Sequence, residues 1–163
     1  MKNPYAPQLG GRAPLEVIAA TPGILTDLVQ RIGPAGARRP WAPGKWTAAH
    51  IVCHLADCEI AFGFRIRQTL SEPNHTVQPF DQDRWARPYS KLNMEPALAA
   101  FNALRHWNLA LVQSLRPDDF GRPLTHPERG EMTLQTILET MGGHDLNHLA
   151  QLRQIRNVPG REA

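Results

Sequence analysis

The chain has 163 residues, of which 42% are hydrophobic and 20% charged, and this composition is typical of one globular domain. No apolar run approaches the roughly 18 residues of a membrane helix, the first residues lack the apolar segment of a signal peptide, and two cysteines are too few to staple the domain. The net charge is only +3 and the arginines are scattered, so we expect a cytoplasmic protein that acts on a small molecule and binds neither nucleic acid nor a membrane.

Proline and glycine divide the chain into four stretches without strand-like alternation. These stretches predict helices over Leu15–Ile32, Thr47–Ser71, Pro96–Leu115 and Thr133–Asn157. In the first, Thr21-Pro22 allows one kinked helix or two helical pieces; Thr47 is the expected N-cap of the second. The fold class is therefore predicted to be all-α, a four-helix bundle with essentially no sheet. The bundle is expected over 14–158, between an N-terminal tail, 1–13, and a C-terminal tail, 159–163.

Two of the predicted connections are long. The second and third helices are joined by 72–93, and the third and fourth by 116–132. Long connections in compact domains are usually functional or ordered by other contacts. We expect these two to form a lid over one end or one side of the bundle.

Histidines on two of the predicted helices suggest a metal site. At about 100° per residue, His148 lies near the middle of the apolar stripe of the fourth helix, with His144 one turn earlier. Residues i and i+4 share a helix face, so both imidazoles can bind one ion. His54, on the flank of the stripe of the second helix, is the candidate third ligand, whereas His50 lies closer to solvent. The alternative is that these histidines are hydrogen-bonded core residues.

Four other side chains are candidates for roles around this site. Asp57 is either a solvated charge or an acceptor for a ligand imidazole. Gln151 either orients a bound water or substrate or is a plain polar position, and His126 is either a turn residue or a donor at the mouth of the site. Cys58 is interpreted as a small core residue, with a fourth metal ligand as the alternative.

One cation falls on a helix face that should be buried. Arg105 lies on the apolar stripe of the third helix, and a buried cation needs a carboxylate partner. Asp145 and Glu59 are the candidates. The remaining histidines, His75 and His106, are expected at the surface.

These motifs, in this order, resemble those of the DinB-like superfamily, specifically its DinB_2 branch. The matching segments are Lys45-Trp46-Thr47, His54-Leu55-Ala56-Asp57, Phe80-Asp81-Gln82-Asp83, His126-Pro127 with Gly130 and Thr133-Leu134, and His144-Asp145 with His148-Leu149-Ala150-Gln151. The resemblance runs from about Leu15 to Arg156. It implies a bundle that holds one divalent metal ion, commonly zinc or nickel, through His54, His144 and His148.

The resemblance also implies a function. Some members of the family are similar to S-transferases that use a low-molecular-weight thiol such as bacillithiol or mycothiol, and others to metal-dependent hydrolases, so a metal-dependent enzyme of one of these kinds is expected. Because no protein base lies beside the three histidines, a non-catalytic metal- or ligand-binding stress protein is the alternative. A homodimer is expected as well, and Trp107, on the outer side of the third helix, suits an interface.

Overall fold

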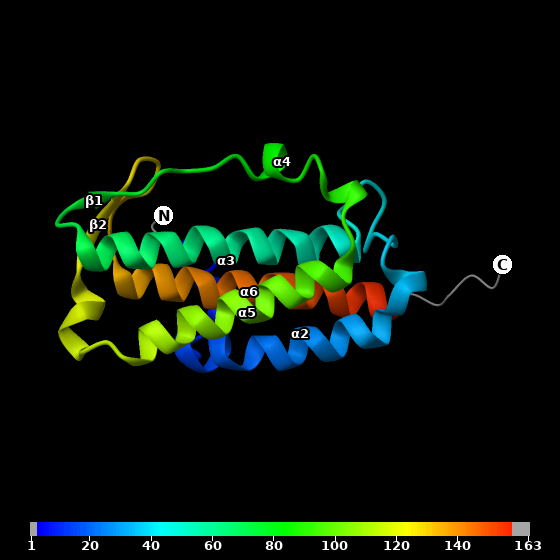
Figure 1. Ribbon diagram of the computed structural model, residues 1–163, viewed down its shortest axis with the longest axis horizontal. Helices are drawn as coiled ribbons and strands as arrows, with labels where there is room; N and C mark the ends of the chain where they lie inside the picture. Colours follow the sequence, from blue (N-terminus) through cyan, green and yellow to red (C-terminus); the bar gives the residue numbers. More distant parts are fainter. Residues whose placement is uncertain (1–2, 158–163) are drawn as a thin grey trace.

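Four long helices form the body of the protein in the computed structural model, which describes residues 3–157 (Figure 1). They are α2 (Pro14–Gly36), α3 (Ala48–Ser71), α5 (Met94–Gln113) and α6 (Leu134–Asn157). The predicted all-α four-helix bundle is confirmed. The region expected as an N-terminal tail contains a short helix, α1 (Ala6–Leu9), that contacts α6. The expected C-terminal tail, 159–163, lies outside the described residues.

The path of the chain makes two pairs of neighbouring helices parallel. The main contacts place the helices in the order α2, α6, α3, α5 around the bundle. Figure 1 shows that the connection 72–93 returns along the length of α3, so that α5 starts at the same end of the bundle as α3. Both helices run opposite to α2 and α6. The two helices that carry the candidate histidines, α3 and α6, are therefore antiparallel neighbours.

The two long connections meet in a small sheet, which corrects the expectation of essentially no sheet. β1 (His75–Thr76) pairs in parallel with β2 (Pro123–His126), and β2 pairs antiparallel with β3 (Gly130–Thr133). Strands of two to four residues are too short to show an alternating pattern in the sequence. The same connections contain the short helices α4 (Gln82–Trp85), η1 (Tyr89–Lys91) and η2 (Pro117–Gly121).

Helix α2 continues through the proline at which a break was considered. Thr21 does not cap a second helical piece, because its hydroxyl donates to the carbonyl oxygen of Val17 at 2.8 Å. Pro22 has no N–H to donate to the carbonyl of Ile18, four residues earlier, so this carbonyl is free for another donor. The non-helical residue is Gly33, whose φ of 62° is one that glycine adopts readily.

Helix α3 begins at the predicted N-cap. The hydroxyl of Thr47 accepts from the backbone N–H of His50, and the His50 ring accepts from the backbone N–H of Thr47. This reciprocal pair satisfies two backbone donors at the start of the helix. At the start of α6, the hydroxyl of Thr133 accepts from the backbone N–H of Thr136. Both contacts fix where a histidine-bearing helix starts.

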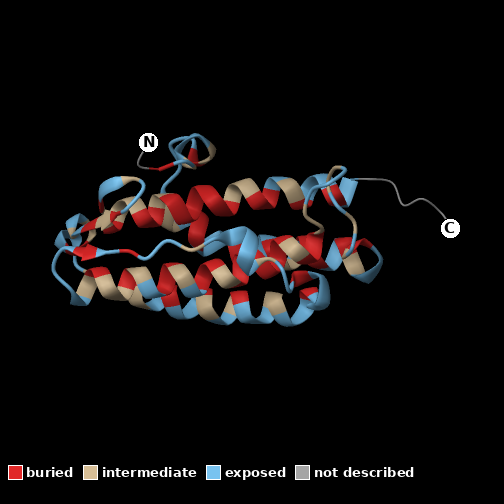
Figure 2. Cartoon of the chain, turned by 90° about the horizontal axis from the view of Figure 1, so that it is seen from above, coloured by how far each residue is buried: buried red, intermediate tan, exposed pale blue. Residues whose placement is uncertain are grey.

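A polar layer separates two apolar clusters, one toward each end of the bundle. On α5, Phe101 belongs to one cluster and Leu109 to the other, and Arg105 lies between them. On α6, Asp145 lies in the corresponding gap. Figure 2 shows that buried residues line the inner sides of the long helices, with exposed residues on their outer sides. The polar layer is therefore enclosed on both sides by apolar core.

Arg105 occupies this layer and has no solvent exposure. Its Nη1 donates to Asp145 Oδ2 at 2.7 Å and to the Ile18 carbonyl oxygen at 2.9 Å, and its Nη2 donates to Glu59 Oε1 at 2.7 Å. The predicted ion pair is confirmed, and both candidate carboxylates take part in it. The carbonyl that Pro22 leaves free is thus satisfied by Arg105, and one guanidinium joins α2, α3, α5 and α6.

Candidate metal centre

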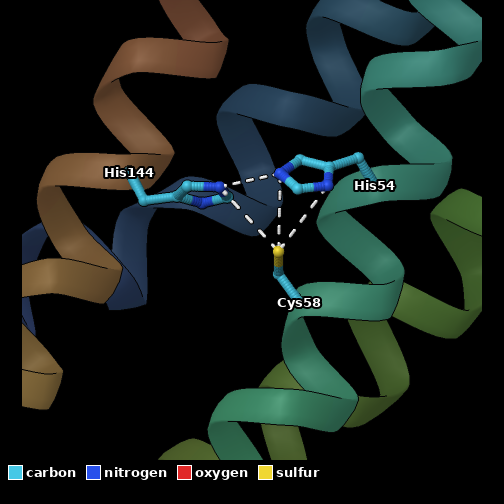
Figure 3. Close-up of side chains that lie close together, drawn as sticks. All are labelled: His54, Cys58 and His144. Carbon is cyan, nitrogen blue, oxygen red and sulfur yellow. Dashed lines mark hydrogen bonds between the residues drawn. The ribbon is translucent and has the colours of Figure 1, made fainter. Parts of the chain in front are cut away.

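Three buried imidazoles meet where α3 packs against α6. Nε2 of His144 lies 2.9 Å from Nε2 of His54 and 3.2 Å from Nε2 of His148. Figure 3 shows the rings of His54 and His144 turned toward each other from the two helices. All three side chains are at most 6% exposed. The structure thus brings together the three histidines that the helical spacing and the family resemblance select.

Burial keeps these imidazoles neutral. It lowers the pKa of His54 to about 3, with a further contribution from His148. Burial also lowers the pKa of His144 well below its usual value, and the charges of its two histidine neighbours and of Arg105 act in the same direction. The pKa of His148 is lowered by burial too, although its bond to Gln151 and the nearby Asp145 oppose the shift. Neutral imidazoles are the form that binds a metal ion.

The three facing nitrogens share too few protons to satisfy one another. Nδ1 of His148 donates to the carboxamide oxygen of Gln151 at 2.9 Å, so Nε2 of His148 carries a lone pair. If Nε2 of His144 carries a proton, this one proton has two acceptors, Nε2 of His54 and Nε2 of His148. If Nε2 of His54 carries the proton instead, the lone pairs of His144 and His148 face each other. A cation accepts all three lone pairs at once. The separations of 2.9 and 3.2 Å are close to the about 3.3 Å between two nitrogens of a tetrahedral zinc site.

Aromatic side chains from outside the two helices cover the cluster. Trp46, in the segment before α3, has its ring centre 4.9 Å from that of His54 and 6.4 Å from that of His148. Tyr5, from the N-terminal segment, packs edge to face on His144 at 5.1 Å. Gly143 makes this approach possible, because a Cβ there would collide with the carbonyl oxygen of Tyr5.

Cys58 also belongs to this cluster. Its Sγ lies 3.5 Å from Nε2 of His54 and 3.8 Å from Nε2 of His144, and the three residues form a group of potential metal-binding atoms (Figure 3). The side chain is buried, as expected for a core residue. Burial, followed by the carboxylates of Glu59 and Asp145, raises the pKa of the Cys58 thiol. The uncomplexed thiol is therefore protonated at neutral pH.

The other candidate residues lie at different distances from the cluster. Gln151 holds His148 through the bond described above. Asp57 accepts from the hydroxyl of Tyr89, and no bond joins it to an imidazole of the described chain. His50 is engaged at the helix N-cap. His126 is buried in β2, where its Nδ1 accepts from the backbone N–H of Glu128 at 3.2 Å.

A cavity of about 410 Å³ opens directly onto the cluster. His54, Cys58 and His144 line one part of it, and His126 lines another. Its size falls within the range of small-molecule sites. His126 therefore shares a cavity with two of the three clustered histidines, a placement that depends on the fold of β2 and that sequence spacing alone does not give.

Two expectations for the remaining histidines have different outcomes. His106 is exposed, as expected. The expectation for His75 is wrong: this residue is only 9% exposed, because it lies in β1, and its Nδ1 is 3.1 Å from Glu72 Oε2. The cause is the small sheet, which the sequence did not predict.

Sequence reasoning missed several residues that line the site. On α3, Arg65 follows His54 by eleven residues, which is three helical turns, and it lines the same cavity. This spacing was a usable signal. Arg129 also lines the cavity, but it comes from the turn between β2 and β3. Tyr5 and Trp46 reach the site from irregular segments, for which helical periodicity gives no signal.

Comparison with known proteins identifies relatives of this chain. The sequence profile described as DinB superfamily matches residues 18–152. Proteins named "Putative metal-dependent hydrolase" from Bacillus cereus strain ATCC 14579 and from Bacillus thuringiensis subsp. konkukian are each 27% identical over 143 residues, which cover 87% of this chain and 83% of theirs.

A solved structure has the same fold. It is described as "YfiT from Bacillus subtilis is a probable metal-dependent hydrolase with an unusual four-helix bundle topology". The match has a TM-score of 0.81 and 24% sequence identity, and it covers 87% of this chain and 83% of that one. Within residues 3–157, no helix has both the length and the apolar character needed to cross a bilayer.

Proposed function

The chain belongs to the DinB superfamily, and from this premise we propose that it is a divalent-metal-dependent hydrolase whose ion is held by His54, His144 and His148. One observation carries the proposal: three buried imidazoles present their Nε2 atoms to one another beside a cavity large enough for a small molecule. The names of the Bacillus relatives support the same class of reaction.

The donor set suits catalysis better than a purely structural role. Three protein ligands leave at least one coordination position open, which is typical of catalytic metal sites. When bound, a divalent ion supplies Lewis acidity and lowers the pKa of water that it coordinates. The residues of the chain do the rest: Gln151 orients His148, while Trp46 and Tyr5 pack over the imidazoles and limit the access of bulk water. The cavity holds the substrate.

Zinc and nickel are the ions that we propose for the site. Imidazole binds both, and a sulfur ligand favours zinc over the hard cations magnesium and calcium. Cys58 is placed to become a fourth ligand, since its sulfur lies beside two of the three nitrogens. In that case its thiol loses its proton on binding. If the Cys58 thiol keeps its proton and stays unbound, this position is left to water or substrate.

We further propose that the protein acts as a homodimer on a small-molecule substrate. Trp107 on α5 is 67% exposed. Aromatic residues are enriched in protein interfaces relative to the rest of the surface, so this exposed indole is the expected centre of the contact between two copies.

Metal content and spectroscopy of alanine variants test the site. Each protein is loaded with zinc, or with cobalt as a coloured substitute, and dialysed at fixed pH before metal analysis. His54→Ala, His144→Ala and His148→Ala are expected to lose most of the bound ion, because each removes one of only three imidazole ligands. His50→Ala is the matched control, one turn from His54, and is expected to keep one ion per chain.

Three outcomes of this experiment contradict the proposal in different ways. If all three cluster variants retain the metal, the three histidines do not form the metal site. If His50→Ala loses the metal and His54→Ala retains it, the ligand on α3 is His50 and not His54. If the metal-loaded protein hydrolyses none of a panel of nitrophenyl esters and amides, hydrolysis is not supported. New charge-transfer bands when cysteine or bacillithiol is added to the cobalt protein then indicate thiol transfer, and an inert spectrum indicates non-catalytic binding.

A further inference from the structure

The cavity beside the imidazole cluster is lined by two arginines that form no ion pair with a carboxylate of the described residues. Arg65 projects from α3 and Arg129 from the turn between β2 and β3, and both line the cavity. Within residues 3–157, five other arginines form ion pairs with carboxylates, whereas neither of these two does. The paired arginines are Arg31, Arg84, Arg105, Arg116 and Arg122.

The two guanidinium groups are held close enough to repel each other. Arg65 is fixed by a hydrogen bond from its Nη2 to the carbonyl oxygen of Gln78, at 3.2 Å, and by the ring of Phe80, 5.7 Å away. Burial lowers the pKa of Arg65, and the like charge of Arg129 lowers it further. Two half-buried cations that are in no ion pair are unfavourable, and an anion between them relieves both the repulsion and the lost hydration.

A third donor lies on the same wall. Because Nδ1 of His126 accepts from the backbone N–H of Glu128, the proton of the neutral ring is on Nε2, where it is free to donate. The pKa of His126 is lowered by burial and then by Arg129 and Arg65, although the Glu128 carboxylate opposes the shift, so the ring stays neutral. The antiparallel pairing of His126 with Gly130 fixes both ends of the turn that carries Arg129.

The rest of the cavity is suited to the remainder of a small ligand. Phe62 and Phe80 provide apolar wall, and Phe62 also packs against His144, with ring centres 6.1 Å apart. A molecule in this cavity therefore has an anion-binding end at the two arginines and the imidazole cluster at the other. Glu128 also lines the cavity, but it is exposed at the rim.

We propose that Arg65, Arg129 and His126 form a subsite that binds the anionic oxygen group, a carboxylate or a phosphate, of a small-molecule substrate. This inference rests on the proposed function for the meaning of "substrate", but the binding itself needs no metal. The arginines hold the anion through charge-assisted hydrogen bonds, and the bond to be cleaved is presented to the histidine cluster. The subsite thereby selects anionic over neutral substrates.

Calorimetric titration of the metal-free protein, dialysed free of chelator, tests the subsite. The probes are phenyl phosphate and benzoate, with benzyl alcohol as the neutral match. At least one of the two anions is expected to bind, and benzyl alcohol is expected to bind at least about tenfold more weakly. The anion that binds with the higher affinity shows whether a phosphate or a carboxylate is preferred.

Variants locate the binding. Arg65→Gln and Arg129→Gln are each expected to weaken anion binding by about tenfold, the usual effect of losing one charged hydrogen bond. Arg153→Gln, which removes the same charge from an exposed position on α6, is the control and should leave the affinity unchanged. Glu128→Gln should strengthen binding, since it removes a negative charge from the rim. Circular dichroism and the melting temperature establish that each variant is folded. Arg129→Gln changes a residue in a turn and is therefore expected to disturb folding least.

The inference is overturned if benzyl alcohol binds as well as both anions, if neither anion binds, or if the Arg65 and Arg129 variants bind like Arg153→Gln. Its failure is distinguishable from failure of the proposed function. His54→Ala is expected to lose metal but keep anion binding. A protein that keeps its metal and hydrolyses esters, yet binds no anion, contradicts the subsite alone.

Discussion

The surroundings of three histidines keep their imidazoles neutral, which is the form that binds a metal ion. An exposed imidazole has a pKa of about 6.5. Burial lowers the pKa of His54 to about 3 and also lowers the pKa values of His144 and His148. The folded protein therefore resists protonation at these positions. The unfolded chain does not, and this difference links protonation to stability.

The metal-free protein should lose stability as the pH falls below about 6.5. The unfolded chain then takes up protons that the folded cluster does not, so the free energy of unfolding decreases, by up to about 1.4 kcal/mol per pH unit for each histidine. His54 alone accounts for a loss of about 2 kcal/mol by pH 5, given its pKa of about 3. Urea unfolding at pH 7.5, 6 and 5 measures this dependence.

Two variants establish which histidines are responsible. His54→Asn should make the dependence on pH shallower, because one protonation site is removed from the unfolded chain. His106→Asn, at an exposed position on α5, should leave it unchanged. Equal slopes for the wild-type protein and His54→Asn would show that His54 is not buried as a neutral ring.

The sequence predicted part of the site because part of it follows helical spacing. His144 and His148 are four residues apart on α6, and the structure places the Nε2 atom of His144 beside those of His54 and His148. Cys58 has the same spacing from His54, but a buried cysteine is so common in protein cores that its pattern pointed to packing. Arg129 comes from a turn whose position depends on the small sheet, and no local pattern predicts that.

At the scale of helices, one side chain ties all four long elements together. Arg105 on α5 was predicted to pair with one carboxylate, and the structure gives it two, Glu59 on α3 and Asp145 on α6, together with the Ile18 carbonyl on α2. The periodicity of α5 indicated a buried cation, whereas the acceptor on α2 depends on Pro22 and on the register between two helices. Only the first of these can be inferred from one helix.

Removing the cation should cost more than removing one of the anions. Arg105→Met leaves two buried carboxylates without their counter-charge and the Ile18 carbonyl without its side-chain donor, and we expect a loss of about 3–5 kcal/mol. Asp145→Asn keeps the Arg105–Glu59 pair and should cost less. The free energy of urea unfolding is the measurement. Arg31→Met, which breaks an exposed pair with Asp27, is the control and should cost about 1 kcal/mol or less.

A smaller loss for Arg105→Met than for Asp145→Asn would contradict this account. It would mean that Glu59 becomes protonated at little cost once the guanidinium is gone. The raised pKa of Glu59, caused mainly by burial, makes that outcome measurable as a loss that shrinks at lower pH.

At the scale of the whole molecule, the sequence predicted the four helices but not how they are arranged. Prolines and glycines mark the ends of the helices, and those marks are local. The order α2, α6, α3, α5 depends on the connection 72–93 running back along α3. The sheet that anchors this connection joins His75 to Leu124, residues far apart in the sequence. Such pairing leaves no periodic signal in strands this short.

The dimer stays a prediction at this scale. Sedimentation velocity should show two copies per particle for the wild-type protein, and Trp107→Glu should shift the protein to one copy, because a charge at the centre of an interface is costly. Trp85→Glu, at another exposed tryptophan, should leave the dimer intact. A wild-type protein that sediments as a monomer at high concentration would contradict the dimer.

The position of Arg105 has a consequence for how the protein moves. Because α5 carries the buried guanidinium and each of the other three long helices supplies one partner to it, no helix can detach without leaving an unpaired charge or carbonyl in the core. Partial opening is therefore costly, and the bundle opens as one cooperative unit. Asp145 adjoins His144 in the sequence, so the imidazole cluster is part of that unit. The lifetime of the cluster is then the lifetime of the whole fold, and access to it changes only through the outer segments, the N-terminal one and the long connections.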